Sequence, residues 1–135
     1  MDFVEGLETL TLIEKYVGMG RRVDGTWVLS LPKRQVYAAF ECASPESAVS
    51  SATGIDDIDA PQGILPQMLR EGMNFQHGTI PNSSNRTYRK KGIFVVKSPH
   101  HWKRHMGKTL KEALDSAAID YKHMNPFYAT TGHAR

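Results

Sequence analysis

The sequence predicts a single small α+β domain, with a mostly antiparallel sheet and helices packed on one face. The 135 residues fit one domain of common size, with enough chain to build a hydrophobic core. Hydrophobic residues make up 40% and charged residues 23%, as is ordinary for globular proteins. Apolar residues recur at helical spacing in some segments, while other segments are rich in β-branched and aromatic residues. The predicted order is helix, strand, strand, helix, helix, strand, helix.

The first predicted element is an amphipathic helix over residues 2–17, because apolar residues recur there every three or four positions. Asp2 suits the N-cap position, and Gly18 and Gly20 are predicted to end the helix. The apolar stripe of this helix consists of Phe3, Leu7, Leu10, Ile13 and Val17.

A predicted hairpin and a second helix follow. Residues 26–31 and 35–42 are rich in β-branched and aromatic side chains, which favours two strands joined by a turn at 32–34. Ser44 precedes a Pro and a Glu, a combination typical of a helix start, and Gly54 marks its end. The predicted sheet therefore has a helix directly after its first hairpin.

The second half of the sequence alternates predicted loops with regular elements. Residues 55–63 are predicted to be an acidic loop and residues 64–71 a short helix. Residues 73–91 lack helical or strand periodicity and are predicted to be a long loop. The apolar run at 92–97 indicates a buried strand, and a helix is predicted from Ser98 to about Ala118.

The last predicted helix has an apolar stripe, which we expect to face the core. The stripe consists of Trp102, Met106, Leu110, Ala113, Leu114 and Ala117. Trp102 suits either core packing or stacking on a nucleic-acid base, and the sequence leaves both open. Residues 119–135 are predicted to be an irregular tail.

Cations are concentrated in one segment, residues 86–111, which we call the basic segment. It holds nine of the seventeen Lys and Arg residues and no Asp or Glu, so the rest of the chain has eight cations against fourteen acids. Such segregation can steer a polyanion to one surface. The basic segment predicts binding of nucleic acid, RNA rather than DNA, or of a nucleoprotein assembly. Docking on an acidic protein surface is the non-enzymatic alternative.

The predicted nucleic-acid contacts combine cations, histidines and one aromatic ring. Lys and Arg side chains are expected to meet phosphates, while Tyr88 is expected to stack on a base. The N-terminus of the helix predicted at Ser98-Pro99 adds backbone N–H groups that favour an anion. The predicted site residues are Tyr88, Arg89, Lys90, Lys91, Lys97, His100, His101, Lys103, Arg104, His105 and Lys108.

Part of this region resembles a family of ribosomal proteins from the small-subunit head that double as transcription antitermination factors. The resemblance is carried by Gly78-Thr79-Ile80-Pro81, Arg89-Lys90, Val95, Ser98-Pro99-His100 and Lys103. It covers roughly residues 78–104, and neither the preceding residues nor the helix predicted after Lys103 follows the family. The resemblance implies a ferredoxin-like α+β fold and RNA contact through residues 78–104.

A second local pattern resembles ADP-ribosyltransferase-like and RNA phosphotransferase-like enzymes. His77-Gly78-Thr79 is similar to their dinucleotide-holding strand, and Gly92-Ile93-Phe94 to a later strand. The helix that normally lies between these strands is missing from the prediction. The resemblance implies an enzyme acting on a nicotinamide dinucleotide, as an alternative to the binding protein.

Other features of the sequence favour a non-enzymatic protein. No residue is assigned as catalytic or as a metal ligand, and no cofactor is predicted. The single cysteine, Cys42, cannot form an internal disulfide and suits a reducing compartment. No apolar run reaches the roughly 20 residues that span a bilayer. We therefore expect a soluble, cytoplasmic protein without membrane contact, and the sequence leaves its oligomeric state open.

Overall fold

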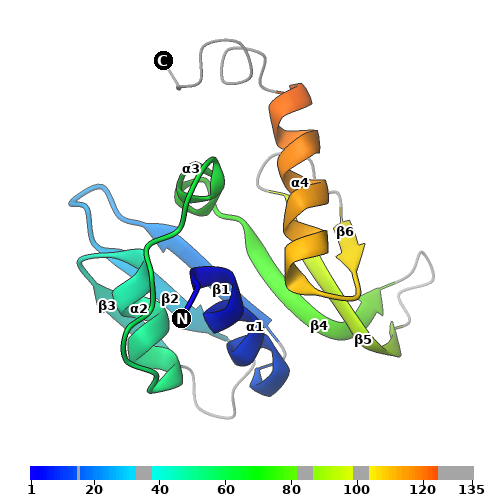
Figure 1. The fold of residues 1–135 in the computed structure, drawn as a ribbon, viewed down its shortest axis with the longest axis horizontal. Helices are drawn as coiled ribbons and strands as arrows, with labels where there is room; N and C mark the ends of the chain where they lie inside the picture. Colours follow the sequence, from blue (N-terminus) through cyan, green and yellow to red (C-terminus); the bar gives the residue numbers. More distant parts are fainter. Residues whose placement is uncertain (15, 33–37, 82–86, 99–103, 125–135) are drawn as a thin grey trace.

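The computed structural model is an α+β domain with a six-stranded antiparallel sheet and four helices (Figure 1). This confirms the predicted fold class. The structure describes residues 1–14, 16–32, 38–81, 87–98 and 104–124. None of the helices in these ranges combines the length and apolarity that crossing a bilayer requires.

The elements follow one another along the chain in a repeated order. The first five are α1 (Phe3–Ile13), β1 (Tyr16–Arg21), β2 (Trp27–Leu31), β3 (Ala38–Cys42) and α2 (Pro45–Thr53). The next five are α3 (Leu65–Arg70), β4 (Asn74–Pro81), β5 (Thr87–Lys97), β6 (Arg104–Gly107) and α4 (Leu110–Met124). Each half therefore runs helix, three strands, helix. The element order shows this repeat, whereas the sequence shows no matching period.

The two halves share one sheet, with strand order β3-β2-β1-β4-β5-β6. Each half contributes an antiparallel three-stranded meander, and β1 pairs antiparallel with β4 at the centre, where Val17 lies opposite Phe75. This arrangement has the form of an approximate two-fold relation about the central pair. It differs from the β-α-β-β-α-β order of a ferredoxin-like fold, so the fold implied by the ribosomal-protein resemblance is wrong.

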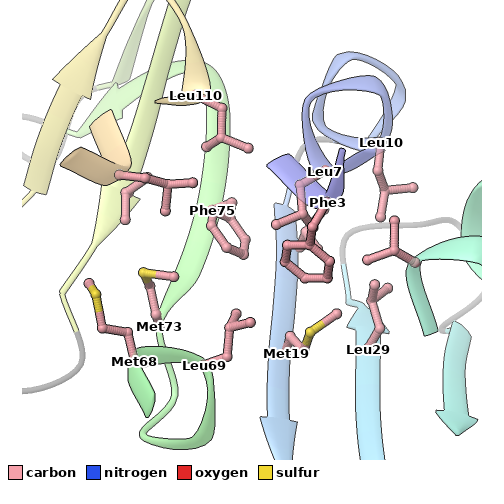
Figure 2. Packing of buried hydrophobic residues seen from close by; sticks show 14 of the residues in the cluster. Phe3, Leu7, Leu10, Met19, Leu29, Met68, Leu69, Met73, Phe75 and Leu110 are labelled. Atoms are coloured by element: carbon pink, nitrogen blue, oxygen red, sulfur yellow. The ribbon is translucent and has the colours of Figure 1, made fainter. Parts of the chain in front are cut away.

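The core lies between one face of the sheet and the helices. Along each strand, residues that face the helices alternate with residues on the other face. The covered residues are Val17 and Met19 in β1, and Trp27, Leu29 and Leu31 in β2. Figure 2 shows Phe3 and Leu7 of α1 beside Met19 of β1, with Phe75 of β4 near Met73 and Leu69. All four helices contribute residues to this one cluster, so every helix in the described ranges packs on the same face of the sheet.

The predictions around β2, β3 and α2 are confirmed. β2 pairs antiparallel with β3, as predicted for the hairpin, while the turn itself lies outside the described residues. Ser44 caps α2, its hydroxyl accepting a hydrogen bond from the Ser47 N–H at 3.2 Å. Gly54 ends the helix with a φ of 76°, a left-handed conformation that glycine adopts without strain.

The first helix is shorter than predicted. Asp2 caps it as expected, accepting hydrogen bonds from the Val4 and Glu5 N–H groups. However, α1 ends at Ile13, and Gly18 and Gly20 lie inside β1. Val17 fits the helical spacing as well as the period-two spacing of a strand. Pairing of β1 with both neighbouring strands satisfies its backbone and outweighs local helix propensity.

The long loop predicted at residues 73–91 is wrong, because these residues include β4 and the start of β5. Asn74, Gln76 and Gly78 weaken the strand signal in β4. The pairing shifts register between His77 and Thr79, where Gly78 alone stands against the four β5 residues between Arg89 and Phe94, so the irregularity lies in β5. Long-range pairing with β5 thus imposes a strand on a locally weak sequence.

The helix predicted from Ser98 to Ala118 is wrong at residues 104–107 and confirmed from Leu110 to Ala118. Residues 104–107 form β6, and Met106 is 53% exposed instead of facing the core. α4 begins at Leu110 and buries Leu110, Ala113, Leu114 and Ala117, as the predicted stripe requires. It continues to Met124, so the first part of the expected irregular tail is helical. Residues 99–103 and 125–135 lie outside the described residues.

Gly107 explains how β6 can turn directly into α4. A Cβ added there would lie 2.6 Å from the Cβ of Glu112 and 2.8 Å from the backbone nitrogen of Ala113. Both distances are too short for real contacts, and the backbone of α4 has little freedom to move. The tight approach of strand and helix therefore requires glycine at this position.

We predict that Gly107→Ala lowers the free energy of unfolding by about 1–3 kcal/mol, the usual cost of overpacking. Urea denaturation followed by circular dichroism measures the change. Gly20→Ala is the matched control, because an added Cβ there meets no atom within 4 Å. Equal stability of the two variants would contradict the close approach of β6 to α4.

Candidate nucleic-acid interface

The face of the sheet opposite the helices, which we call the open face, presents two rows of side chains across β1, β4, β5 and β6. Registered residues on neighbouring strands point to the same side. One row consists of Tyr16, Gln76, Val95 and Met106, and the next of Gly18, Asn74, Lys97 and Arg104. The open face therefore gathers an aromatic ring, two amides and two cations from four strands.

A groove of about 210 Å³ lies among these side chains. Its lining consists of Tyr16, Asn74, Phe75, Gln76, Val95, Lys97 and Arg104. Phe75 and Val95 are buried, Arg104 is exposed, and the other four are half-buried. Lys97 and Arg104 are directly opposite in the β5–β6 register. The side chain of Phe75 faces the core, so Val95 is the apolar side chain in the floor of the groove, and the walls are polar and cationic.

Tyr16 leans along its own strand toward Gly18. A Cβ added at Gly18 would lie 3.9 Å from Cε1 of Tyr16 and 3.2 Å from the Ser30 hydroxyl oxygen. The Tyr16 ring therefore lies beside Gly18 at ordinary contact distance, and the tight neighbour of a side chain at this position would be Ser30. Burial raises the pKa of Tyr16, so its hydroxyl stays protonated near neutral pH and brings no negative charge to the cationic wall.

Charge on the open face differs between its two ends. Near β2 and β3, the Arg22 guanidinium donates a hydrogen bond to the Glu41 carboxylate at 2.7 Å. The hydrogen bond that Arg22 donates to Glu41 and the negative charge of that carboxylate raise the pKa of Arg22, so Arg22 stays charged and paired with Glu41. Lys97 and Arg104 lie at the opposite end, near the β6 edge. The cations of the groove therefore lie on the β4–β6 side of the sheet, while Arg22 and Glu41 lie on the β2–β3 side.

The predicted contact residues separate into three groups. Lys97 and Arg104 lie in the groove, and Lys108 is exposed in the turn before α4. Four others, Tyr88, Arg89, Lys90 and Lys91, lie on β5, the strand that also carries Lys97. The remaining surface candidates, His100, His101 and Lys103, lie outside the described residues, as does Trp102.

His105 lies apart from the surface cations. It is opposite Val96 in the β5–β6 register and so belongs to the covered face, where its side chain is 9% exposed. Its Nδ1 is 3.0 Å from the Ser116 hydroxyl oxygen, and its Nε2 is 3.7 Å from Oδ2 of Asp120, both residues of α4. His105 therefore joins β6 to α4 and is not placed to meet a ligand with Lys97 and Arg104.

The groove includes three polar residues that the sequence did not single out: Tyr16, Asn74 and Gln76. Tyr16 lay at the end of an expected helix, and the two amides lay in an expected loop. The available signal was the alternation of Asn74, Phe75 and Gln76, which has one apolar residue between two polar ones. That alternation is short, and only pairing with β1 and β5 shows which side faces solvent.

The N-terminus of α4 is already occupied by groups of the protein. The Leu110 N–H donates a hydrogen bond to Glu8 Oε2 of α1 at 3.0 Å, and the Glu112 N–H donates to the Thr109 hydroxyl at 3.2 Å. A helix start at Ser98-Pro99 was expected to offer an anion site. α4 instead begins at Leu110, directly after Thr109, and the carboxylate of Glu8 supplies the negative charge that the helix dipole favours.

The segments that resemble transferases lie on paired strands. His77 is opposite Phe94, with ring centroids 4.5 Å apart. Phe94 is buried in the core cluster, so this contact lies on the covered face. Within the described ranges, no three His, Cys, Asp or Glu side chains form a set that can hold a metal ion.

A larger cavity of about 380 Å³ lies between α1, α3 and α4. Much of its lining is apolar, including Val4, Leu65 and Leu114. Two of its charged residues, Lys111 and Asp115, form an ion pair of 2.7 Å with each other. The groove on the open face is smaller but carries the cations and amides that can recognise a polar ligand, so it is the stronger candidate site.

Comparison of the chain with known protein families, curated proteins and solved structures gives no match. The resemblances to ribosomal proteins and to transferases therefore rest on the local motifs alone. The candidate site has to be judged by its own geometry and chemistry.

We predict that His105→Ala lowers the free energy of unfolding by about 1–3 kcal/mol. The substitution removes the contact with Ser116 and also the imidazole beside the partly buried carboxylate of Asp120. Chemical denaturation measures the loss. Lys108→Ala, in the exposed turn, is the control and should change stability by less than about 0.5 kcal/mol. A fully stable His105→Ala variant with weakened RNA binding would contradict the structural role of His105.

Proposed function

We propose that the protein binds nucleic acid, RNA in preference to DNA, on the open face near β4, β5 and β6. One observation carries the proposal: Lys97 and Arg104 lie opposite each other at a groove that also contains Tyr16, Asn74 and Gln76. Cations bind phosphates, amides bind base edges and sugar hydroxyls, and an aromatic ring stacks on a base. All three kinds of group needed for nucleic acid are present within this one groove.

The basic segment extends the electrostatic support for this proposal. β5 carries Arg89, Lys90 and Lys91 along the strand that ends with Lys97. The ion pair between Arg22 and Glu41 leaves the other end of the face less attractive to a polyanion.

Polar groups that donate hydrogen bonds favour RNA over DNA. Tyr16, Asn74 and Gln76 each offer an O–H or N–H donor, and the 2′-hydroxyl of ribose is both a donor and an acceptor. An acidic protein surface offers carboxylates to the cations but no base to the ring and the amides. We propose a non-enzymatic binding protein that works in the cytoplasm, where the single thiol of Cys42 stays reduced.

Fluorescence anisotropy with labelled RNA and DNA tests the proposal. We expect tight binding at about 50 mM salt that weakens steeply by 200 mM, as phosphate contacts release counterions. Lys97→Gln with Arg104→Gln should weaken binding about tenfold or more and reduce the salt dependence, since two phosphate contacts are lost.

The matched control is Lys111→Gln with Lys122→Gln, which removes the same charge from α4 on the helical side. This control should bind RNA nearly as well as the unmodified protein. Equal losses in both double variants would show that only net charge matters. Absence of binding at low salt would overturn the proposal, and direct titration with NAD and with an acidic polypeptide would then test the two alternatives.

A further inference from the structure

We infer that the groove on the open face holds one unpaired base of a single strand, stacked on Tyr16 and contacted at its edge by Asn74 and Gln76. This inference rests on the proposed function and makes it more specific. It selects single-stranded over double-stranded nucleic acid, and it assigns the groove to a base instead of a phosphate.

The size of the groove fits one flat ring system. Its volume of about 210 Å³ is below the roughly 300–1,000 Å³ of sites for drug-sized ligands. A phosphate needs cations and N–H donors on several sides, whereas this groove has the buried side chain of Val95 in its floor. An apolar floor favours the face or edge of a base over a charged group.

Tyr16 is placed to act as the stacking platform. Its ring lies beside Gly18, and Tyr16 is half-buried and therefore partly accessible. Partial burial restricts the ring before a ligand arrives, which lowers the entropy lost on binding. The raised pKa of Tyr16 keeps the ring neutral beside an anionic strand.

The two amides are placed to contact the edge of the same base. Asn74 and Gln76 are two residues apart on β4, so both point to the open face. Each side-chain amide has a donor and an acceptor, which is the combination that base edges require. Lys97 and Arg104 lie on the next two strands, where they can bind the phosphates that flank the base.

Duplex RNA is excluded from this mode of binding unless a base leaves the stack. Extrusion of a base from a duplex costs a few kcal/mol, while an unpaired base has little such cost. The groove therefore favours single strands, loops and bulges. Cations alone would bind duplex and single strand without this distinction.

The test compares two oligonucleotides with the same number of phosphates: a short single-stranded RNA and the same strand with abasic positions. We expect the unmodified protein to bind the complete strand about 5- to 150-fold more tightly, the range for one base stacked on an aromatic ring. Tyr16→Ala should remove this preference, and Tyr16→Phe should retain it. Circular dichroism checks that both variants are folded.

A second readout does not depend on a polymer. Titration with nucleoside monophosphates, followed by NMR signals of the Tyr16 ring, should give ring-current shifts that ribose phosphate does not cause. Asn74→Ala and Gln76→Ala should change which of the four bases causes the largest shift.

The outcomes separate the inference from the proposed function. If the protein binds complete and abasic strands equally, with steep salt dependence, nucleic-acid binding stands and the base site is wrong. If Tyr16→Ala binds like the unmodified protein, the stacking role is also wrong. If no nucleic acid binds at low salt, the proposed function and the base site are both overturned.

Discussion

The pairing of β1 with β4 is the constraint on which the rest of the structure depends. Val17 of β1 lies opposite Phe75 of β4, and both side chains are buried. The junction between the two halves is therefore part of the core. Each half has only about the size at which a domain buries some 60% of its unfolded surface and is marginally stable. Joining two meanders across one pair gives both halves a common core.

The helices follow from the same pairing. Residues from α1, α2, α3 and α4 belong to one cluster with the covered face of the sheet. A polar contact also connects the two halves, because Glu8 of α1 caps α4. Within the second half, the Tyr121 hydroxyl of α4 donates a hydrogen bond to Glu71 beside α3 at 2.6 Å. The helices of the described ranges all lie on one side of the sheet, so none of them covers the other face.

The sequence predicted elements well where local and long-range preferences agree. Ser44 and Gly54 bound α2 as expected, because caps depend on neighbouring residues alone. It predicted poorly where pairing decides, as for β1, β4 and β6. In β1, Val17 fits both the helical and the strand periodicity. β4 is rich in residues that favour loops. In β6, a strand places His105 toward the core and Met106 toward solvent, the reverse of what the predicted helix requires. No local signal could reveal that Tyr16, Asn74 and Arg104 meet, since this depends on the register of four strands.

NMR mapping of a single-stranded RNA onto the isotope-labelled protein is the most direct test of a binding site on the open face. We expect the largest amide shifts at Tyr16, Asn74, Gln76, Lys97 and Arg104, on the open face, with small shifts in α1 and α2. Shifts concentrated on the helices, or spread evenly over exposed cations such as Lys111 and Lys122, would contradict a binding site on the open face.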